Sequence, residues 1–210
     1  MTEFLQLCFA GLALGARYAL VALGFVIIYK ATGVINFAQG GLVALGAYLA
    51  YAFNTVLPFL AAVILAASVA ATFGAAVERV VLRRMVGQPV FAVIMITIGL
   101  LFIIEQAITA TWGYDALNLA DPWGVDTIRA ADVVMAERDL WTIGIAAGVL
   151  GAFFLFFRFS TLGVAMRATA FDQEAALAQG ISARRVFAAS WAIAAGLAAL
   201  AGVTLAAGPA

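Results

Sequence analysis

Apolar segments long enough to cross a lipid bilayer follow one another along almost the whole chain, and this feature constrains the fold most. A soluble core could not bury them all, because 66% of the residues are hydrophobic and only 10% are charged. The sequence therefore predicts an all-α, polytopic membrane protein in which residues 1–210 form a single transmembrane domain with about six helices. The segments cover approximately residues 4–29, 34–54, 57–82, 89–112, 139–158 and 187–208.

The composition also argues against several classes of function. The chain has no histidine and a single cysteine, Cys8, so we expect no metal site, no catalytic centre and no cofactor. Lys and Arg together number 11, as do Asp and Glu, and without a basic cluster interleaved with aromatic residues we expect no nucleic-acid partner. The N-terminus carries Glu3 and its apolar run is too long for a signal peptide, so we expect a retained first helix in contact with lipid.

Lys and Arg residues gather on alternate sides of the predicted helices, which indicates the orientation, since basic residues near helix ends remain preferentially cytoplasmic. We expect the N-terminus outside, the turn at 83–88 and the 159–186 segment inside, and the acidic 113–138 loop outside. The basic residues on the predicted inner side are Lys30, Arg79, Arg83, Arg84, Arg158, Arg167, Arg184 and Arg185; only Arg129 and Arg138 lie on the outer side. The acidic residues of the outer loop are Asp115, Asp121, Asp126, Asp132 and Glu137.

The stretch Tyr29–Tyr48, "YKATGVINFAQGGLVALGAY", places amides and glycines where a helix should cross lipid. Irregular backbone at membrane depth survives only where protein or a wet cavity surrounds it, and interrupted helices of transporters commonly line the substrate route. Alternatively, the stretch is a short cytoplasmic turn after Lys30 whose amides cap the next helix, which is a common use of Asn near Gly. If the stretch lines a pathway, the candidate residues are Asn36, Phe37, Gln39, Gly40 and Gly41.

The 159–186 segment predicts two short helices joined at a glycine. The run "EAALAQG" extends from Glu174 to Gly180, and Ser182 can cap a following helix. Small alanines would let this segment pack closely into a groove on another protein. The alternative is an ordinary solvated amphipathic connector.

These motifs resemble those of a known family. Glu174-Ala175-Ala176 followed after three residues by Gly180 resembles the EAA---G signature of ATP-binding cassette (ABC) importer permeases, the helix that docks on the ATPase subunit. The stretch Gly15–Tyr48 resembles the N-terminal signature of the permease family for branched-chain amino acids, in the subunit type whose motif reads "NFA-G". The similarity continues at Glu78–Met85, Ile96–Gln106 and Leu162–Ile181, so it spans nearly the entire chain.

The resemblance implies an inner-membrane subunit of a bacterial ABC importer for branched-chain or other hydrophobic amino acids, or for related small amides. It implies four kinds of partner: a second related permease, two cytoplasmic ABC ATPases, an external solute-binding protein and membrane lipid. Glu174, Ala175, Ala176 and Gly180 would couple the ATPases to alternating access. The apolar-x-Leu-Pro ending of many importers is absent, which departs from the wider importer signature but not from the branched-chain subtype. Family members continue beyond Ala210, so we expect a chain that is incomplete at its C-terminus.

Energy coupling separates this interpretation from its rivals. The only lysine, Lys30, lies in "YKATG" without a preceding glycine loop, so no P-loop is present and ATP would have to be hydrolysed by a separate subunit. An ion-gradient-driven secondary transporter would usually need several buried ionisable groups arranged as a relay. Arg17 and Glu105 alone are too few to form one. An intramembrane enzyme would need paired carboxylates or a Ser/Lys dyad, and neither pattern is visible in the sequence.

Arg17 and Glu105 are the charged residues predicted deep inside apolar segments, away from the segment ends. Arg17 precedes Lys30 by 13 residues and Glu105 follows Pro89 by 16, which in helices corresponds to depths of about 20 and 24 Å. A lone charge in the bilayer costs at least about 2.5 kcal/mol, so we expect an Arg17–Glu105 contact between the first and fourth segments. Alternatively, the first helix breaks near Gly11 and Gly15, and Arg17 reaches a polar boundary.

Overall fold

The computed structural model describes residues 2–85, 88–113, 119, 122, 126–130 and 133–206. Much of the predicted outer loop, including Asp115, Asp121 and Asp132, therefore lies outside the described residues. The α-helices are α1 (Thr2–Thr32), α2 (Gln39–Asn54), α3 (Phe59–Val80), α4 (Val90–Trp112), α5 (Glu137–Phe159), α6 (Thr161–Phe171), α7 (Gln173–Ala178) and α8 (Ala183–Ala206). A 3-10 turn, η1 (Leu82–Met85), follows α3, and an antiparallel hairpin of β1 (Thr127–Ala130) and β2 (Val133–Ala136) precedes α5.

The described chain contains five helices that are long and apolar enough to cross a membrane, in agreement with the predicted polytopic, mostly helical fold. They are α1, α3 together with η1, α4, α5 and α8. The remaining predicted segment, 34–54, does not form a long helix. Its first residues are not helical, and α2 has only 16 residues. At 1.5 Å per residue this helix is about 24 Å long, shorter than the roughly 30 Å of a bilayer's hydrocarbon core.

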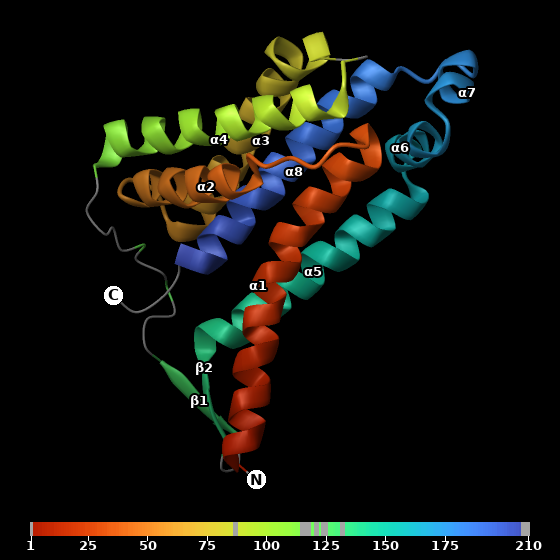
Figure 1. Ribbon diagram of the computed structural model, residues 1–210. Coiled ribbons are helices and arrows are strands. Elements are labelled where there is room, and N and C mark those ends of the chain that lie inside the picture. Colours follow the sequence, from red (N-terminus) through yellow and green to blue (C-terminus); the bar gives the residue numbers. More distant parts are fainter. Residues whose placement is uncertain are drawn as a thin grey trace.

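The helix ends fall into two groups (Figure 1). The last turns of α1, α3 and α5 and the first turns of α4 and α8 lie at the end of the molecule that also carries α6 and α7; we call this the α7 end. Away from the α7 end the helices diverge: α4 ends at the left of the view, the start of α1 and the β1–β2 hairpin lie at the bottom, and α8 ends between them. All eight basic residues predicted for the inner side belong to elements at the α7 end, so the structure gathers these residues at one end of the molecule.

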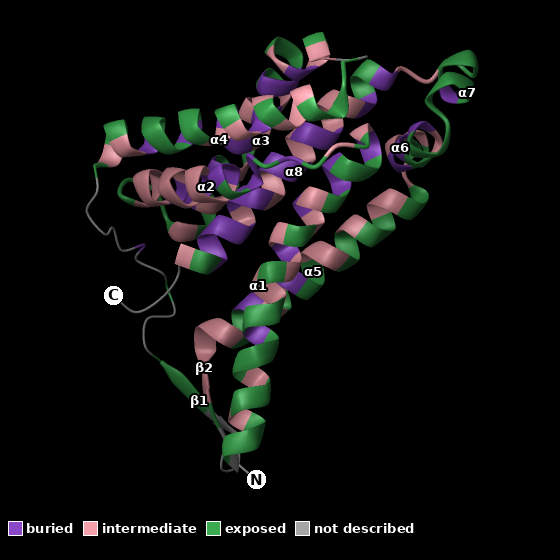
Figure 2. Cartoon of the chain, viewed as in Figure 1, coloured by how far each residue is buried: buried purple, intermediate pink, exposed green. Residues whose placement is uncertain are grey.

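Helix α8 forms the centre of the bundle. It packs most extensively against α3, α2 and α1, and 61% of its membrane-length window is buried, against 11–28% for the other long helices described. Small residues make this contact possible: a Cβ on Gly46 of α2 would overlap Ala199, and one on Gly202 of α8 would overlap the Val43 carbonyl. Lipid provides no hydrophobic force between helices, so this close van der Waals contact stabilises the bundle (Figure 2).

Helices α1 and α5 form a second, looser pair. They pack along each other and their surfaces away from the bundle are exposed, including Phe4 and Leu7 near the start of α1 (Figure 2). The first turns of α1 also lie beside β2. Apolar side chains on such surfaces are compatible with lipid contact, which is the environment that the sequence predicts for them.

Candidate functional site

The break between α1 and α2 begins at a glycine. Gly33 has φ 72° and its N–H donates to the Tyr29 carbonyl at 2.8 Å, which closes the last turn of α1. Side chains other than Gly rarely adopt this left-handed conformation, so Gly33 explains why the helix ends here. Residues 34–38 then run back towards the interior of the bundle and lead into α2.

The start of α2 lies well inside the bundle. The Phe37 N–H donates to Thr97 Oγ1 at 3.2 Å, and Thr97 lies seven residues, or about 10 Å, beyond the start of α4. The Gln39 amide lies against Gly24, which is eight residues, or about 12 Å, before the end of α1. Helix α2 therefore begins about two helical turns in from the α7 end, rather than after a short turn at the surface.

Two buried amides lie at this break. The exposed fraction is 1% for Asn36 and 0% for Gln39. Asn36 Oδ1 accepts a hydrogen bond from the Ala38 N–H at 3.0 Å. This one bond agrees with the alternative in which the amides cap the next helix. Asn36 Nδ2 and both amide atoms of Gln39 make no hydrogen bond within the described part of the chain. An unpartnered buried polar group costs about 1–3 kcal/mol, so these amides call for a functional explanation.

The remaining residues predicted to line a pathway divide into two groups. Gly41 is buried and faces Leu101 and Ile104 of α4. Phe37 is 44% exposed and Gly40 is also exposed, so both lie on the outer surface of the bundle. The structure thus brings Asn36, Gln39 and Gly41 into the interior and leaves the other two outside.

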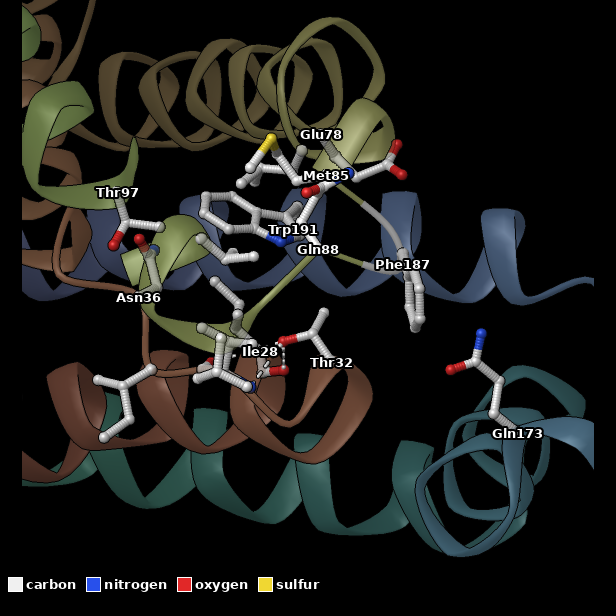
Figure 3. Close-up of a pocket in the computed structure, with 15 residues that line it drawn as sticks. Ile28, Thr32, Asn36, Glu78, Met85, Gln88, Thr97, Gln173, Phe187 and Trp191 are labelled. Atoms are coloured by element: carbon white, nitrogen blue, oxygen red, sulfur yellow. Dashed lines mark hydrogen bonds between the residues drawn. The ribbon is translucent and has the colours of Figure 1, made fainter. Parts of the chain in front are cut away.

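A cavity of about 180 Å³ opens beside the break at the α7 end. Asn36 and Thr97 lie at one end of it, Trp191 lies in the middle, and Gln173 lies at the other end (Figure 3). Most of the wall is apolar and comes from α1, η1, α4 and α8. The lining residues are Ile28, Thr32, Val34, Ile35, Asn36, Glu78, Leu82, Met85, Gln88, Val90, Val93, Thr97, Gln173, Phe187 and Trp191.

Glu78 is the one charged side chain among the described residues that line this cavity. It is 2% exposed, and its carboxylate accepts hydrogen bonds from Arg83 Nη2 at 2.8 Å and Nε at 3.3 Å. Arg83, which is 30% exposed, is not among the lining residues. The sequence analysis did not single out this pair, although an acid at the end of an apolar run, five residues before an arginine in the next turn, was a usable signal.

The predicted Arg17–Glu105 contact is wrong. Arg17 pairs with Asp139, with 2.6 Å between Nη2 and Oδ1, and the two side chains are 19% and 21% exposed. Glu105 is exposed on α4. Depth alone could not identify the partner, because α1 packs along α5, whose first turn carries Asp139. The alternative is also wrong, because α1 is continuous through Gly11 and Gly15.

The predicted coupling segment folds into α6 and α7, which project from the bundle (Figure 1). Asp172 Oδ1 accepts the Ala175 N–H at 2.9 Å and so caps α7. Gly180 has φ 81°, and the Ile181 N–H reaches back to the Ala176 carbonyl at 3.0 Å to close the helix. The glycine thus joins α7 to α8, whereas α6 and α7 meet at Asp172.

The residues predicted to contact an ATPase lie mostly on the surface of this segment. Glu174, Ala175 and Gly180 are exposed, and Ala176 is 5% exposed because it faces the rest of the chain. Leu177 is 52% exposed and adds an apolar side chain to the outer face. Gln173, the first residue of α7, lines the cavity described above.

A bundle of long apolar helices with one helix broken inside it, and a short capped helix projecting at its basic end, defines a polytopic membrane protein of the transporter class. The family model described as "Branched-chain amino acid transport system / permease component" matches residues 7–210. The chain belongs to this family of branched-chain amino acid transport permeases.

Several curated proteins are similar to the chain over most of its length. The high-affinity branched-chain amino acid transport system permease protein LivH of Salmonella typhimurium is 30% identical, over 96% of this chain and 70% of LivH. LivH of Escherichia coli K12 is 29% identical with the same coverage. The corresponding permease protein BraD of Pseudomonas aeruginosa is 30% identical, over 97% of this chain and 71% of BraD. No solved structure matches the chain.

Proposed function

We propose that the chain is the membrane-spanning permease subunit of a bacterial inner-membrane ABC importer. It moves branched-chain or other hydrophobic amino acids, or related small amides, by alternating access. The family match over residues 7–210 and the relatives named as branched-chain amino acid permeases support this proposal.

The projecting α6–α7 segment is the observation that carries the proposal. Its helices end in their own caps and leave Glu174, Ala175 and Gly180 exposed at the end of the molecule where basic residues gather. The excess of basic residues favours this end as the cytoplasmic side. A separate ATPase subunit can therefore bind the segment around Glu174 and Gly180 without disturbing the bundle.

Solute would pass along the break between α1 and α2. Asn36 Nδ2 and both amide atoms of Gln39 have no hydrogen-bond partner there among the described residues, and Gly41 allows α2 to lie close to α4. Phe37 and Gly40 face outward, where a second related permease would pack. The β1–β2 hairpin lies beside α1, and we infer that the predicted outer loop 113–138, to which it belongs, offers a surface for an external solute-binding protein.

Energy would come from two separate ATPase subunits, because the chain carries no P-loop sequence of its own. Nucleotide binding closes the ATPases, this closure displaces α7, and the helices around the break then change which side they open to. Partners shift this equilibrium only through their differential affinity for the two states.

The test is reconstitution of the full chain with a second permease, the ATPases and the binding protein in vesicles. We expect leucine uptake that requires ATP, falls at least about tenfold when Asp172→Ala removes the cap of α7, and is retained in Asp172→Asn, which keeps a capping oxygen. Uptake that follows an ion gradient without the ATPases, or ATP hydrolysis by the isolated chain, would contradict the proposal.

A further inference from the structure

We propose that the outer face of α4 is the contact surface for an apolar transmembrane helix of a different subunit, and that this helix carries a Lys or Arg at the depth of Glu105. The inference rests on the proposed function, because the second related permease is the subunit that would supply such a helix. It adds the surface that this partner would use and the charge that would select it.

Glu105 lies deep in a helix that is long enough to cross a membrane. It follows Val90 by 15 residues and precedes Trp112 by seven, which corresponds to about 22 and 10 Å along the helix. Trp112 lies beside Tyr48 of α2, with ring centroids 5.4 Å apart, and aromatic residues of this kind gather where a membrane meets water. Glu105 therefore lies about 10 Å inside that boundary.

The carboxylate of Glu105 has no partner in the described chain. Glu105 is exposed, and within the part of the chain that the structure describes it makes neither an ion pair nor a hydrogen bond. A charge that faces hydrocarbon is costly, and ionisable residues of membrane helices almost always pair or face the interior of a bundle. Snorkelling to the interface is a property of the longer Lys and Arg side chains. The outward-facing carboxylate therefore indicates that another chain covers it.

The rest of this face of α4 is apolar and open. Helix α4 packs mainly against α2, and only 22% of its membrane-length window is buried. Figure 2 shows exposed surface along the helix, where Phe91, Met95, Phe102 and Ile103 are 44–70% exposed. Phe102 lies three residues before Glu105, on the same side of the helix. A single charge within an apolar face fits a partner helix that is itself apolar and carries one cation.

A second copy of the chain does not provide that cation. Among the described helices, the basic residues away from the α7 end are Arg17 and Arg138. Arg17 is already paired with Asp139, and Arg138 lies in the first turn of α5, directly after the hairpin. A twofold axis along the membrane normal would also place Glu105 of both copies at one depth, where like charges repel. The surface therefore favours a different subunit over self-association.

Binding of synthetic transmembrane helices to the full chain in phosphatidylcholine vesicles tests the inference. The probes are polyleucine helices with one lysine at the depth of Glu105, or with leucine in its place. Energy transfer to a dye on Thr111→Cys, an exposed position of α4, reports their binding in a Cys8→Ser background. We expect the lysine helix to bind at least about tenfold more tightly than the leucine helix, because hydrogen bonds between charged groups are the stronger ones.

Variants of α4 separate the charge from the surface around it. Glu105→Gln keeps the shape of the side chain and removes its charge. It should lower the affinity for the lysine helix at least about tenfold and leave that for the leucine helix unchanged. Gln106→Leu is the matched control, because Gln106 is the next exposed residue of α4, and both affinities should be unchanged. Co-purification of the second permease with the chain should fall in Glu105→Gln and not in Gln106→Leu.

Three outcomes would overturn the inference. One is equal binding of the lysine helix to the wild-type chain and to Glu105→Gln, which would leave the face to lipid. Another is a dimer of the chain alone that Glu105→Gln weakens, which would assign the face to a second copy. The third is loss of lysine-helix binding when the chain is extended beyond Ala210 with the corresponding segment of LivH, because the added helices would then cover the face.

The inference and the proposed function fail in different ways. Binding that ignores the charge of Glu105, together with ATP-driven leucine uptake, would overturn the inference and leave the proposed function standing. Charge-dependent binding in a chain whose leucine uptake needs no ATPase would contradict the proposed function and leave the α4 surface as a contact site.

Discussion

The chain breaks its helices in two places that look alike in sequence and differ in structure. Residues 33–38 and 172–182 each combine a polar side chain with a glycine of positive φ, Gly33 at 72° and Gly180 at 81°. The first break lies inside the bundle and leaves amide atoms unpartnered within the described residues. The second projects from the bundle, and both ends of α7 are closed by hydrogen bonds.

This difference indicates a division of tasks between the two breaks. A break on the surface can be satisfied locally and offered to another protein, because water and caps supply hydrogen bonds. A break among apolar helices persists only if neighbouring elements hold it, and here α1, α4 and α8 surround the start of α2. Under the proposed function, the inner break would contact the solute and the outer break would contact an ATPase.

The largest expected effect concerns the contact between α8 and α2, the helix that follows the inner break. Gly202→Ala would place a Cβ against the Val43 carbonyl and 2.9 Å from the Ala47 N, both on the backbone of α2. We expect a loss of about 1–3 kcal/mol, typical of overpacking, seen as a lower denaturation midpoint of the purified chain. Gly196→Ala is the matched control, because its Cβ would meet Ala67 O at an ordinary 3.5 Å; equal losses in both variants would refute the assignment.

The two glycines that open the breaks test the comparison directly. Gly33→Ala and Gly180→Ala each force a residue with a Cβ into the left-handed region, at a cost of about 1–2 kcal/mol, and neither Cβ meets an atom within 4 Å. We expect Gly33→Ala to lower the stability of the whole bundle and Gly180→Ala to reduce hydrogen-exchange protection in α7 alone. Loss of protection throughout the bundle in both variants would show that the breaks are not independent.

A smaller effect is expected at the ion pair that ties α1, the helix before the inner break, to α5. In a double-mutant cycle of Arg17→Gln and Asp139→Asn, we expect a coupling energy of about 1 kcal/mol, within the range for polar contacts between membrane helices. The same cycle with Glu105→Gln in place of Asp139→Asn should be additive, because Glu105 is exposed on α4. Additive losses for Arg17 and Asp139 would contradict the structure.

The smallest effect on stability should come from Gln39→Leu. Both amide atoms of Gln39 are buried and unpartnered in the described chain, so replacing the amide by an apolar group should change the unfolding free energy by less than about 1 kcal/mol. Leucine uptake by the assembled transporter should nevertheless be lost. Gln106→Leu, on the exposed face of α4, is the control and should retain uptake; retained uptake in Gln39→Leu would remove Gln39 from the pathway.

Hydropathy and cap chemistry were enough to predict much of the fold. The five long helices follow from apolar runs that only lipid can accommodate, and the end of α7 follows from Gly180, which only needs local backbone geometry. The grouping of helix ends at the α7 end agrees with where basic residues gather in the sequence. These features depend on residues that are close in sequence or on the bilayer itself.

Features that depend on which helices are neighbours could not be predicted. Two acidic residues, Asp139 and Glu105, are possible ion-pair partners of Arg17 in the sequence. Arg17 pairs with Asp139 because α1 packs along α5. The depth of Gln39 depends on Gly24, a residue of another helix. Glu78 lines the same cavity as Asn36 only because α3, α4 and α8 pack together around it.

Gln173 belongs to both functional regions, since it is the first residue of α7 and also forms part of the cavity wall. Under the proposed function, an engineer who changed the cavity wall at Gln173 would therefore also alter the helix that the ATPases would contact. Val93, on α4 and remote in sequence from either break, lines the same cavity and allows the wall to be changed without altering α7.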